Sequence, residues 1–367
     1  PIIKSVNSES ERIIQEICPG VNVINDSKLS LRDRIWGKTR ILYSGYSVDN
    51  DIREKCSSGG VISALAIFLL DKGEVDAVLH VGSDPGNYKN NKLKISKTKQ
   101  EILNNSSSRY APSLVFEDIL KILEKTNDTF CFIGKPCDVS ALKNLVKLYP
   151  EYKKRFKHVI SIICAGMPSY KGTEELIDSF NPEKPIKNLQ YRGNGWPGFF
   201  SFEDSYNNKY VKSYNDSWGK VLNKHLCFRC KICPDGIGIL ADIVVGDAWE
   251  TISGSPDFSE KKGKSLVIIR SKKGKKLLKL AQIDEIVKLK KMSTKKLKFI
   301  QPFQFHRRKS VGIRIIAFQS AIFMKVNFVN LSLYINALTY SPLKLINEFW
   351  GTYKRAIKLR VKKNHEL

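Results

Sequence analysis

Histidine is scarce in this chain, with 5 residues among 367. The sequence has no zinc-finger pattern of paired histidines, no aromatic strand of the RNA-recognition type and no helix-turn-helix signature. No specific nucleic acid is therefore expected as a partner. The sequence also has no internal repeat, and its glycine-containing turns match neither the Walker A motif nor the Gly-x-Gly-x-x-Gly fingerprint. The standard mononucleotide and dinucleotide folds are not implied.

Secretory and membrane-spanning patterns are missing as well. The first residues do not combine a basic start, an apolar stretch and a small-residue cleavage site, so we expect a cytoplasmic protein with reduced thiols. The last apolar run is interrupted by Arg314, Lys325 and several asparagines, whereas a spanning helix needs about 20 mostly apolar residues. Three interpretations stay open for this region: a helix that docks on a partner, a helix that lies peripherally on an anionic membrane through the basic stretch 354–363, and a helical cap on the main domain.

Acidic residues are in deficit, with 36 Asp and Glu against 62 Lys and Arg and a formal net charge of +26. The lysines are spread along the chain and gather only after Lys261. We interpret this charge as attraction for an anion, which is a phosphorylated cofactor, an acidic partner protein or an anionic membrane surface. The length and a hydrophobic content of 42% allow a substantial core and two or three domains.

The most informative pattern is a run of three cysteines, Cys227-x-x-Cys230-x-x-Cys233, followed by proline. Thiols at this spacing suit an iron–sulfur cluster, whose fourth ligand must come from elsewhere. Cys137 and Cys164 are the candidates, because each follows an apolar run that predicts a buried strand. Five cysteines are thus candidates for the four ligand positions of a cluster. A structural zinc site and unligated core thiols are the alternatives.

Strand-like and helix-like segments alternate from residue 41 onward. Strands are predicted at 41–46, 75–81, 130–133, 159–163, 199–202, 241–245 and 266–270, and helices at 60–72, 113–124 and 138–148, with a basic helix after 270. This alternation favours an α/β (α+β) fold, in which a mixed sheet with partly parallel pairing carries helices on its faces.

Polar loops at the ends of these segments are candidate anion sites. Ser57-Ser58-Gly59-Gly60 leads into a helix whose first N–H groups favour phosphate, although an ordinary serine N-cap explains the same residues. Arg109 offers a fixed fork for phosphate or carboxylate and Tyr110 a face for a flat ring, unless their loop is simply solvated. Lys135 follows a buried strand and could neutralise a cofactor phosphate or an anionic ring, or be a solvated lysine.

Two further positions lie beyond Cys164. Trp196 stands in a glycine-flanked loop that suits a flat heterocycle, although its indole could equally fill the core. Asp247 follows the apolar run 243–245 and would lie at the carboxyl end of a buried strand. Asp242 precedes the same run and needs a polar partner, because burying an unpaired carboxylate is costly.

Taken in order, these segments resemble the beta-subunit family of coenzyme F420 hydrogenases and dehydrogenases. The resemblance covers roughly residues 35 to 300, and the order and spacing of its motifs make it specific. The motifs are Ser57-Ser58-Gly59-Gly60 with its helix, 73–77, Ser108-Arg109-Tyr110-Ala111-Pro112, Gly134-Lys135-Pro136-Cys137, 164–169, 191–196 and the stretch from Cys230 to Asp247.

The resemblance implies an oxidoreductase that binds FAD and one 4Fe-4S cluster. It would pass hydride or electrons between coenzyme F420, or another small-molecule electron carrier, and a redox partner protein such as a ferredoxin. The implied cluster ligands are Cys137, Cys164, Cys230 and Cys233, which leaves Cys227 spare. The implied flavin site comprises Ser57, Ser58, Gly59, Gly60, Arg109, Tyr110 and Lys135, together with Trp196 and Asp247. No side chain is expected to act as a catalytic acid or nucleophile.

The same resemblance suggests three parts: an N-terminal segment (1–34), a flavin and iron–sulfur domain (35–294) and a basic helical C-terminal extension (295–367). Many relatives carry a ferredoxin-like N-terminal part, of which only Cys18-Pro19 is seen here, so we expect dependence on a partner. The alternatives are an electron-transfer subunit, a reductase associated with polysaccharide biosynthesis that does not use coenzyme F420, and a zinc-stabilised module that binds anions or nucleic acid.

Overall fold

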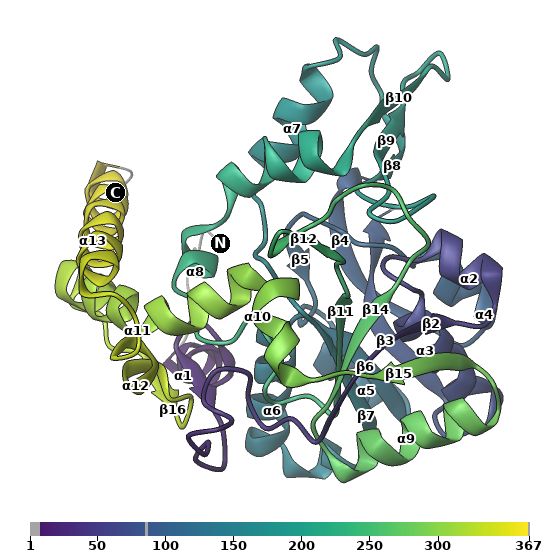
Figure 1. Cartoon of the computed structure of the whole chain (residues 1–367), viewed down its shortest axis with the longest axis horizontal. Coiled ribbons are helices and arrows are strands. Elements are labelled where there is room, and N and C mark those ends of the chain that lie inside the picture. The colour runs from purple at the N-terminus through teal and green to yellow at the C-terminus, as the bar shows by residue number, and fades with distance from the viewer. Residues whose placement is uncertain (1–7, 85–86, 366–367) are drawn as a thin grey trace.

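The computed structural model describes residues 8–84 and 87–365, and its centre is a nine-stranded mixed sheet (Figure 1). In spatial order the strands are β15 (Val287–Lys291), β2 (Ile41–Ser47), β14 (Ser265–Ile269), β11 (Ile243–Asp247), β7 (Phe156–Ile162), β6 (Phe130–Gly134), β3 (Ala77–Asp84), β4 (Asn87–Ser96) and β5 (Ser113–Leu114). The strands β11, β7, β6 and β3 run parallel, and so do β4 and β5 at the far edge. The pairs β11–β14, β14–β2, β2–β15 and β3–β4 are antiparallel. The predicted mixed α/β sheet is confirmed.

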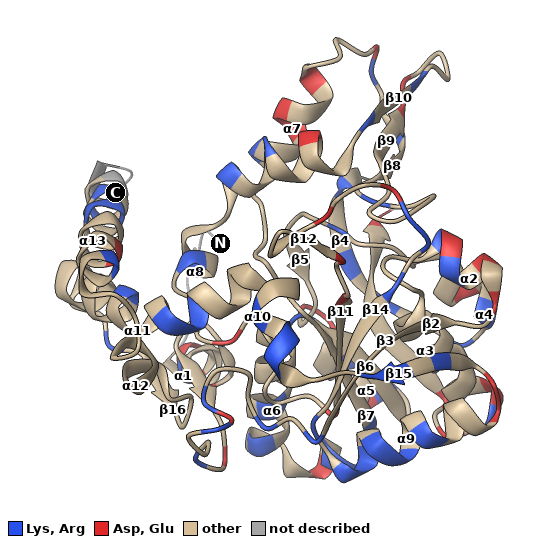
Figure 2. Cartoon of the chain, viewed as in Figure 1, with Lys and Arg blue, Asp and Glu red and all other residues tan. Residues whose placement is uncertain are grey.

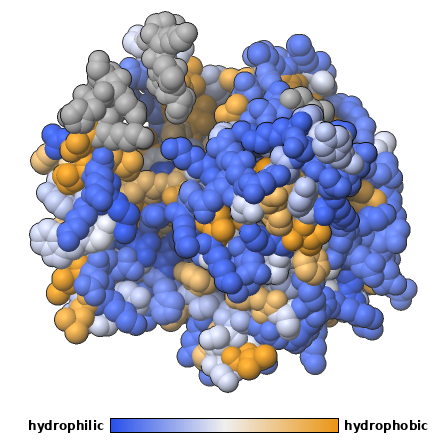
Figure 3. All heavy atoms as spheres, turned by 90° about the horizontal axis from the view of Figure 1, so that it is seen from above, coloured by the Kyte–Doolittle hydropathy of each residue, from blue (hydrophilic) through white to orange (hydrophobic). Residues whose placement is uncertain are grey.

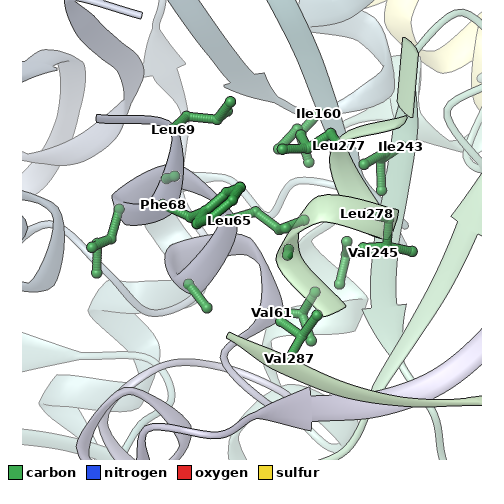
Figure 4. Packing of buried hydrophobic residues seen from close by; sticks show 14 of the residues in the cluster. Val61, Leu65, Phe68, Leu69, Ile160, Ile243, Val245, Leu277, Leu278 and Val287 are labelled. Atoms are coloured by element: carbon green, nitrogen blue, oxygen red, sulfur yellow. The ribbon is translucent and has the colours of Figure 1, made fainter. Parts of the chain in front are cut away.

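One face of the sheet is covered by α3 (Val61–Asp71) and α9 (Lys272–Ile283), as Figure 4 shows at close range. Leu65 and Leu278 from these helices belong to one buried cluster with Ile243 and Val245 of β11. Val244, which lies between them in the strand, belongs to the cluster on the opposite face. This alternation is the period of two that a strand covered on both faces must have.

The opposite face carries α5 (Ile119–Lys125) and α6 (Pro136–Leu148). Leu142 and Leu145 of α6 are buried in one cluster with Phe130, Phe132 and Val159. The short helices α2 (Asn50–Lys55) and α4 (Lys99–Asn104) contact α3, and the 3-10 turn Pro150–Arg155 contacts α6. The helices predicted at 60–72 and 138–148 are thereby confirmed.

The predicted helix at 113–124 is wrong in its first part. Ser113 and Leu114 form β5 and pair in parallel with Asn91 and Lys92 of β4, and the helix begins only at Ile119. The side chain of Asn91 donates to the carbonyl oxygens of Ala111 and Pro112, at 3.1 and 3.2 Å. These contacts hold the chain extended along the free edge of β4, which overrides its local helical pattern.

A small antiparallel sheet projects beyond the large one, in the upper right of Figure 1. It consists of β8 (Lys187–Gln190), β9 (Phe200–Glu203) and β10 (Lys209–Lys212), and its buried cluster includes residues of α7 (Tyr170–Asp178). The predicted strand at 199–202 is confirmed by β9. Asn207 takes a positive φ of 65° in the β9–β10 turn. Other short elements are α8 (Phe228–Lys231), β12 (Thr251–Ile252), β13 (Ser255–Pro256) and α10 (Leu297–Ile300).

The two ends of the chain form one lobe. Strand β1 (Asn22–Ile24), which follows α1 (Ser8–Ile17), pairs in parallel with β16 (Asn327–Val329). Helices α11 (Pro302–Ile322), α12 (Leu333–Ala337) and α13 (Pro342–His365) complete the lobe. Within 8–84 and 87–365, no helix has the length and apolar character needed to span a bilayer. The three-part division of the chain stays a prediction, and the structure adds that its first and last parts are paired.

Candidate functional site

A cavity of about 490 Å³ lies at the carboxyl ends of β6, β7 and β11. Its strand side is lined by Gly134, Ile163 and Gly246, and its other walls come from the loop 105–111, the π-helical turn Asn215–Gly219 and the first residues of α11. Ligands bind at this edge of open sheets that contain parallel strands. The volume lies within the range of small-molecule sites.

Most of the residues predicted for the flavin site line this cavity. They are Ser57, Ser58, Gly60, Arg109, Tyr110, Lys135 and Asp247. Gly59 and Trp196 are not part of the lining. The N–H of Gly59 donates to the Ser265 hydroxyl at 2.9 Å, and a Cβ at this position would lie 2.8 Å from the Gly45 carbonyl oxygen. Gly59 therefore lets its loop approach the sheet closely.

Trp196 is 1% exposed and stacks on Trp249, with ring centroids 4.9 Å apart. Trp249 lines the cavity, so Trp196 lies one layer behind the wall. Tyr214, Trp218 and Phe258 extend this aromatic wall. These residues have the apolar, flat character that a ring system requires, and their assignment to a flavin stays a prediction.

The loop before α3 has an unusual backbone. Ser58 and Gly60 both take positive φ angles, 60° and 71°. The N-cap of α3 is Gly60, and no side chain caps the helix, so the ordinary serine N-cap is not what the structure shows. Gly60, Ile62 and Ser63 line the cavity. The first turn of an 11-residue helix is thus available to an anion.

Asp247 is hydrogen-bonded to several segments of the cavity wall. Its carboxylate accepts hydrogen bonds from the Ser58 hydroxyl and the Trp196 indole, both at 2.7 Å, and from both Nη atoms of Arg192. Burial opposes ionisation of this carboxyl, but Arg192 and the hydrogen bonds from Ser58 and Trp196 together outweigh burial and lower its pKa below the ordinary value. Asp247 therefore fixes three segments as a charged anchor.

Lys135 is held in the wall by two contacts. Its Nζ lies 2.8 Å from Asp138 and 2.7 Å from the Ser113 hydroxyl. Burial alone would lower the pKa of Lys135, whereas Asp138 and the nearby Cys137 raise it, and the result lies above the ordinary value. The solvated-lysine interpretation is therefore wrong, and a charged group faces the cavity.

The Asp242 carboxylate also has polar partners, as its position before a buried strand required. It accepts hydrogen bonds from the Val159 N–H at 3.0 Å and the Ser271 hydroxyl at 2.6 Å.

The thiol segments meet beside the cavity. The N–H of Met167 donates to the Cys230 sulfur at 3.3 Å, and the N–H of Cys164 donates to the Gly236 carbonyl at 2.9 Å. Burial raises the pKa of Cys164 to about 12, and Cys230 and Cys233 add to this effect. Burial also raises the pKa of Cys137, and its neighbours Cys164 and Cys233 contribute in the same direction.

Cys227 lies at the edge of this group, and the Cys230 N–H donates to its carbonyl oxygen at 2.9 Å. Its half-buried thiol has a pKa raised by burial, and among the other thiols it influences Cys230. The structure thus brings together Cys137, Cys164, Cys230 and Cys233. Their role as ligands stays a prediction.

The chemistry of these four thiols fits a 4Fe-4S cluster. Among residues 8–84 and 87–365, no three or more His, Cys, Asp or Glu side chains are grouped closely enough to hold one metal ion. A cubane binds each thiolate to a different iron, so its ligands need not converge on one point. Cations also surround the thiols: Arg307 donates to the Cys164 carbonyl at 3.3 Å, and the buried Arg308 lies near Cys233. These cations would offset the negative charge of a thiolate-bound cluster.

Several of these residues were not predicted. Arg192 stands in the 191–196 motif, but from the sequence a polar partner was sought only for Asp242, so nothing marked Arg192 as the cation beside Asp247. Arg307 and Arg308 stand in a basic run that suggests a surface, yet Arg308 is 1% exposed. Tyr214 and Trp218 reach the cavity through the π-helical turn, for which we find no local sequence signal.

The family described as "Coenzyme F420 hydrogenase/dehydrogenase, beta subunit" matches this chain in two parts. The N-terminal part of that family matches residues 42–120, and its C-terminal part matches residues 127–295. Together they span most of the large sheet and include both thiol segments and the cavity loops.

Individual relatives agree with this match. The chain is 28% identical to the coenzyme F420 hydrogenase subunit beta of Methanococcus voltae, over 73% of this chain and 88% of that protein. It is 28% identical to the F420-dependent formate dehydrogenase 1 subunit beta of Methanococcus maripaludis, over 70% of this chain and 63% of that protein. It is 25% identical to the coenzyme F420-dependent sulfite reductase of Methanocaldococcus jannaschii, over 77% of this chain but only 43% of that protein.

A solved structure shows the same fold. A chain of the F420-reducing NiFe hydrogenase complex from Methanosarcina barkeri matches with a TM-score of 0.58 and 22% identity, over 83% of this chain and 98% of that chain. The family match, the relatives and the fold agree with the motifs that line the cavity. The chain therefore belongs to the coenzyme F420 hydrogenase/dehydrogenase beta-subunit family of oxidoreductases.

Proposed function

We propose that this chain binds FAD in the cavity and a 4Fe-4S cluster on Cys137, Cys164, Cys230 and Cys233. It moves electrons between coenzyme F420, or another soluble carrier, and a redox partner protein. The observation that carries this proposal is the position of Cys164, which lines the cavity and also belongs to the group of four thiols. A ring bound in the cavity and a cluster on the thiols would share one wall, as electron exchange between them requires.

The chain's own residues position and shield these groups. The uncapped first turn of α3 and the Ser57 hydroxyl, which is 2.8 Å from the Ser108 hydroxyl, receive phosphate. Lys135 supplies positive charge to the ring and to Cys137, and the aromatic wall around Trp249 orients the ring and excludes water. When bound, the flavin supplies hydride and one-electron chemistry and the cluster carries single electrons.

Coenzyme F420 is proposed as the soluble substrate because the names of the three curated relatives include it. The eight cysteines are free in the structure, which suits a reducing, cytoplasmic setting. A second candidate is a protein that only relays electrons inside a complex. It is favoured by the fold of the Methanosarcina barkeri chain, which comes from a complex.

Anaerobic purification followed by analysis of iron, sulfide, flavin and zinc tests the cofactor assignment. We expect about four irons and one FAD per chain, and a colourless protein with stoichiometric zinc would overturn the proposal. Reduction of a viologen dye by reduced coenzyme F420 then separates the two candidates. An enzyme catalyses this reaction alone, whereas a relay protein binds both cofactors but shows no activity without its partner.

A further inference from the structure

The C-terminal helix is built directly onto the segment that carries the thiols. Ile232, between Cys230 and Cys233, is buried in one cluster with Phe318 of α11 and Ala356 of α13. The rings of Phe228 and Phe318 have centroids 5.8 Å apart. The guanidinium of Arg314 donates to the Lys231 carbonyl at 2.9 Å. Helix α13 therefore forms the surface next to the proposed cluster.

Positive charge is concentrated at this junction. Lys231 of α8 lies within electrostatic reach of Arg314 of α11 and Arg355 of α13. Arg314 is paired with Glu348, at 2.8 and 2.9 Å, and Glu348 is the only acidic residue in the sequence of α13. Lys354, Arg355 and Lys358 are exposed. In Figure 2 the blue of Lys and Arg appears on α8, α11 and α13, around this junction.

The same helix exposes apolar side chains beside its cations. Leu343 is 75% exposed, and Ile346 and Trp350 are each 53% exposed. Their spacing of three and four residues places them on one side of α13, which Lys354 and Lys358 continue along the helix. Figure 3 shows orange side chains along the left edge, on the side where α13 lies in Figure 1. An apolar centre with a charged surround is typical of a protein interface.

We propose that this surface, the α8–α13 face, docks an acidic one-electron carrier protein. The face is defined by Lys231, Leu343, Ile346, Trp350, Lys354, Arg355 and Lys358. The inference rests on the proposed function, because a carrier bound here brings its redox centre next to Cys230 and Cys233. Charge complementarity identifies the occupant: cations beside a redox centre attract an anionic partner and speed its encounter. An anionic bilayer would engage the apolar side of α13, but it gives no reason for cations to gather at the thiol segment.

The electron balance of the exchange is simple. Oxidation of one reduced coenzyme F420 releases two electrons and two protons. Each carrier molecule accepts one electron at the α8–α13 face, so two carriers are reduced in turn and the protons pass to solvent. The reverse reaction consumes two reduced carriers and two protons. Because every turnover needs two encounters, a weak and rapidly exchanging complex suits the task, as for other redox encounters.

The test compares two sets of charge reversals on the full-length protein. The first variant combines Lys354→Glu, Arg355→Glu and Lys358→Glu on α13. The matched control combines Lys275→Glu, Lys276→Glu and Lys279→Glu, which are exposed on α9 across the large sheet. Anaerobic calorimetric titration with an acidic bacterial ferredoxin measures the affinity. We expect the first variant to bind about tenfold more weakly than the wild type at low salt, and the control to stay within about twofold.

Three outcomes would overturn the docking proposal. They are equal weakening in both variants, absence of ferredoxin binding by the wild type, and binding to phosphatidylserine vesicles that only the α13 variant loses. Vesicle binding of this kind would identify a lipid surface instead. Iron and flavin content and viologen reduction are measured on the same samples. If all three proteins keep the cofactors and the dye activity, a failure of docking leaves the proposed function intact. A wild type without cofactors would contradict the proposed function itself.

Discussion

Arg192 and Asp247 form a bidentate ion pair in the wall of the cavity. Nη1 of Arg192 lies 2.9 Å from Oδ2 of Asp247, and Nη2 lies 3.0 Å from Oδ1. Nε of the same guanidinium donates to the Pro197 carbonyl at 2.7 Å. The pair therefore holds the 191–198 loop against the end of β11, and through the Ser58 hydroxyl it also holds the loop before α3.

Removing one partner of this ion pair should destabilise the folded protein. Arg192→Met leaves the Asp247 carboxylate buried without its cation, so we expect the free energy of unfolding to fall by about 3–5 kcal/mol. Combining Arg192→Met with Asp247→Leu removes both charges and should cost clearly less than the sum of the two single substitutions. Urea unfolding of the four proteins measures this coupling.

A surface ion pair provides the control. Lys261 lies 2.9 Å from Glu250 and 2.6 Å from Asp257, and its side chain is 32% exposed. Because water screens such contacts, Lys261→Met should cost about 0–1 kcal/mol. Strict additivity of the Arg192 and Asp247 substitutions would show that their pairing is not the source of the stabilisation.

The first two thiols of the cysteine run, Cys227 and Cys230, should behave differently. Cys230 interacts electrostatically with Cys233, Cys164 and Cys227, and the Cys227 thiol is half-buried at the edge of this group. Cys227→Ser should keep about four irons per chain, and Cys230→Ser should lose most of the iron. Iron and sulfide analysis after anaerobic purification provides the measurement. Equal loss in both variants would show that the run supplies three ligands to the cluster.

The architecture of the sheet follows from local patterns. Strands β2, β6, β7 and β14 lie within two or three residues of the predicted ranges, because each is an apolar run between turn residues. The edge strands were harder to predict from the sequence. The residues of β15 include three lysines, so they have no apolar run, and Ser113–Leu114 becomes a strand only through its contact with β4.

The site was predictable where chemistry is encoded in a short motif. The residues Ser58, Arg109, Lys135 and Cys164 all line the cavity, because loops at one end of a sheet must meet there. The partnership of Arg192 with Asp247 joins residues 55 positions apart, and the pairing of β1 with β16 joins the two ends of the chain. Such contacts depend on the whole fold and leave no local pattern.

His80 should make the stability of the protein sensitive to acid. Its Nε2 lies 2.8 Å from the Ser96 hydroxyl, and burial, followed by the charge of Lys94, lowers its pKa to about 4. Between about pH 6.5 and about pH 4 the unfolded chain therefore binds a proton that the folded chain excludes, so the free energy of unfolding falls as the pH falls. His80→Gln removes this proton uptake and should flatten the slope.

Urea unfolding at several values between about pH 7 and about pH 5 measures this slope. His306→Gln is the matched control, because His306 is exposed and its replacement should change the slope less. An unchanged slope in His80→Gln would mean that other groups, such as the buried His158, whose pKa burial also lowers, dominate the acid sensitivity.

Arg308 should be essential for holding the lobe against the thiol segment. Its guanidinium is buried and donates to the carbonyl oxygens of Arg34, Ile35, Pro234 and Leu331, at 2.6 to 3.1 Å. Arg308→Met leaves these carbonyls without their donor, which costs about 1–3 kcal/mol for each carbonyl that stays buried. We therefore expect the free energy of unfolding, measured in urea, to fall by more than about 3 kcal/mol.

Two further variants test whether the guanidinium itself is needed. Arg308→Lys should not restore the stability, because an ammonium group cannot reproduce the planar fork. Lys309→Met, at an adjacent side chain that donates to the Thr339 carbonyl in an exposed contact and whose Nζ lies 4.8 Å from the Phe305 ring centroid, should cost no more than about 1 kcal/mol. Equal effects at both positions would show that the basic run acts through its charge and not through this bridge.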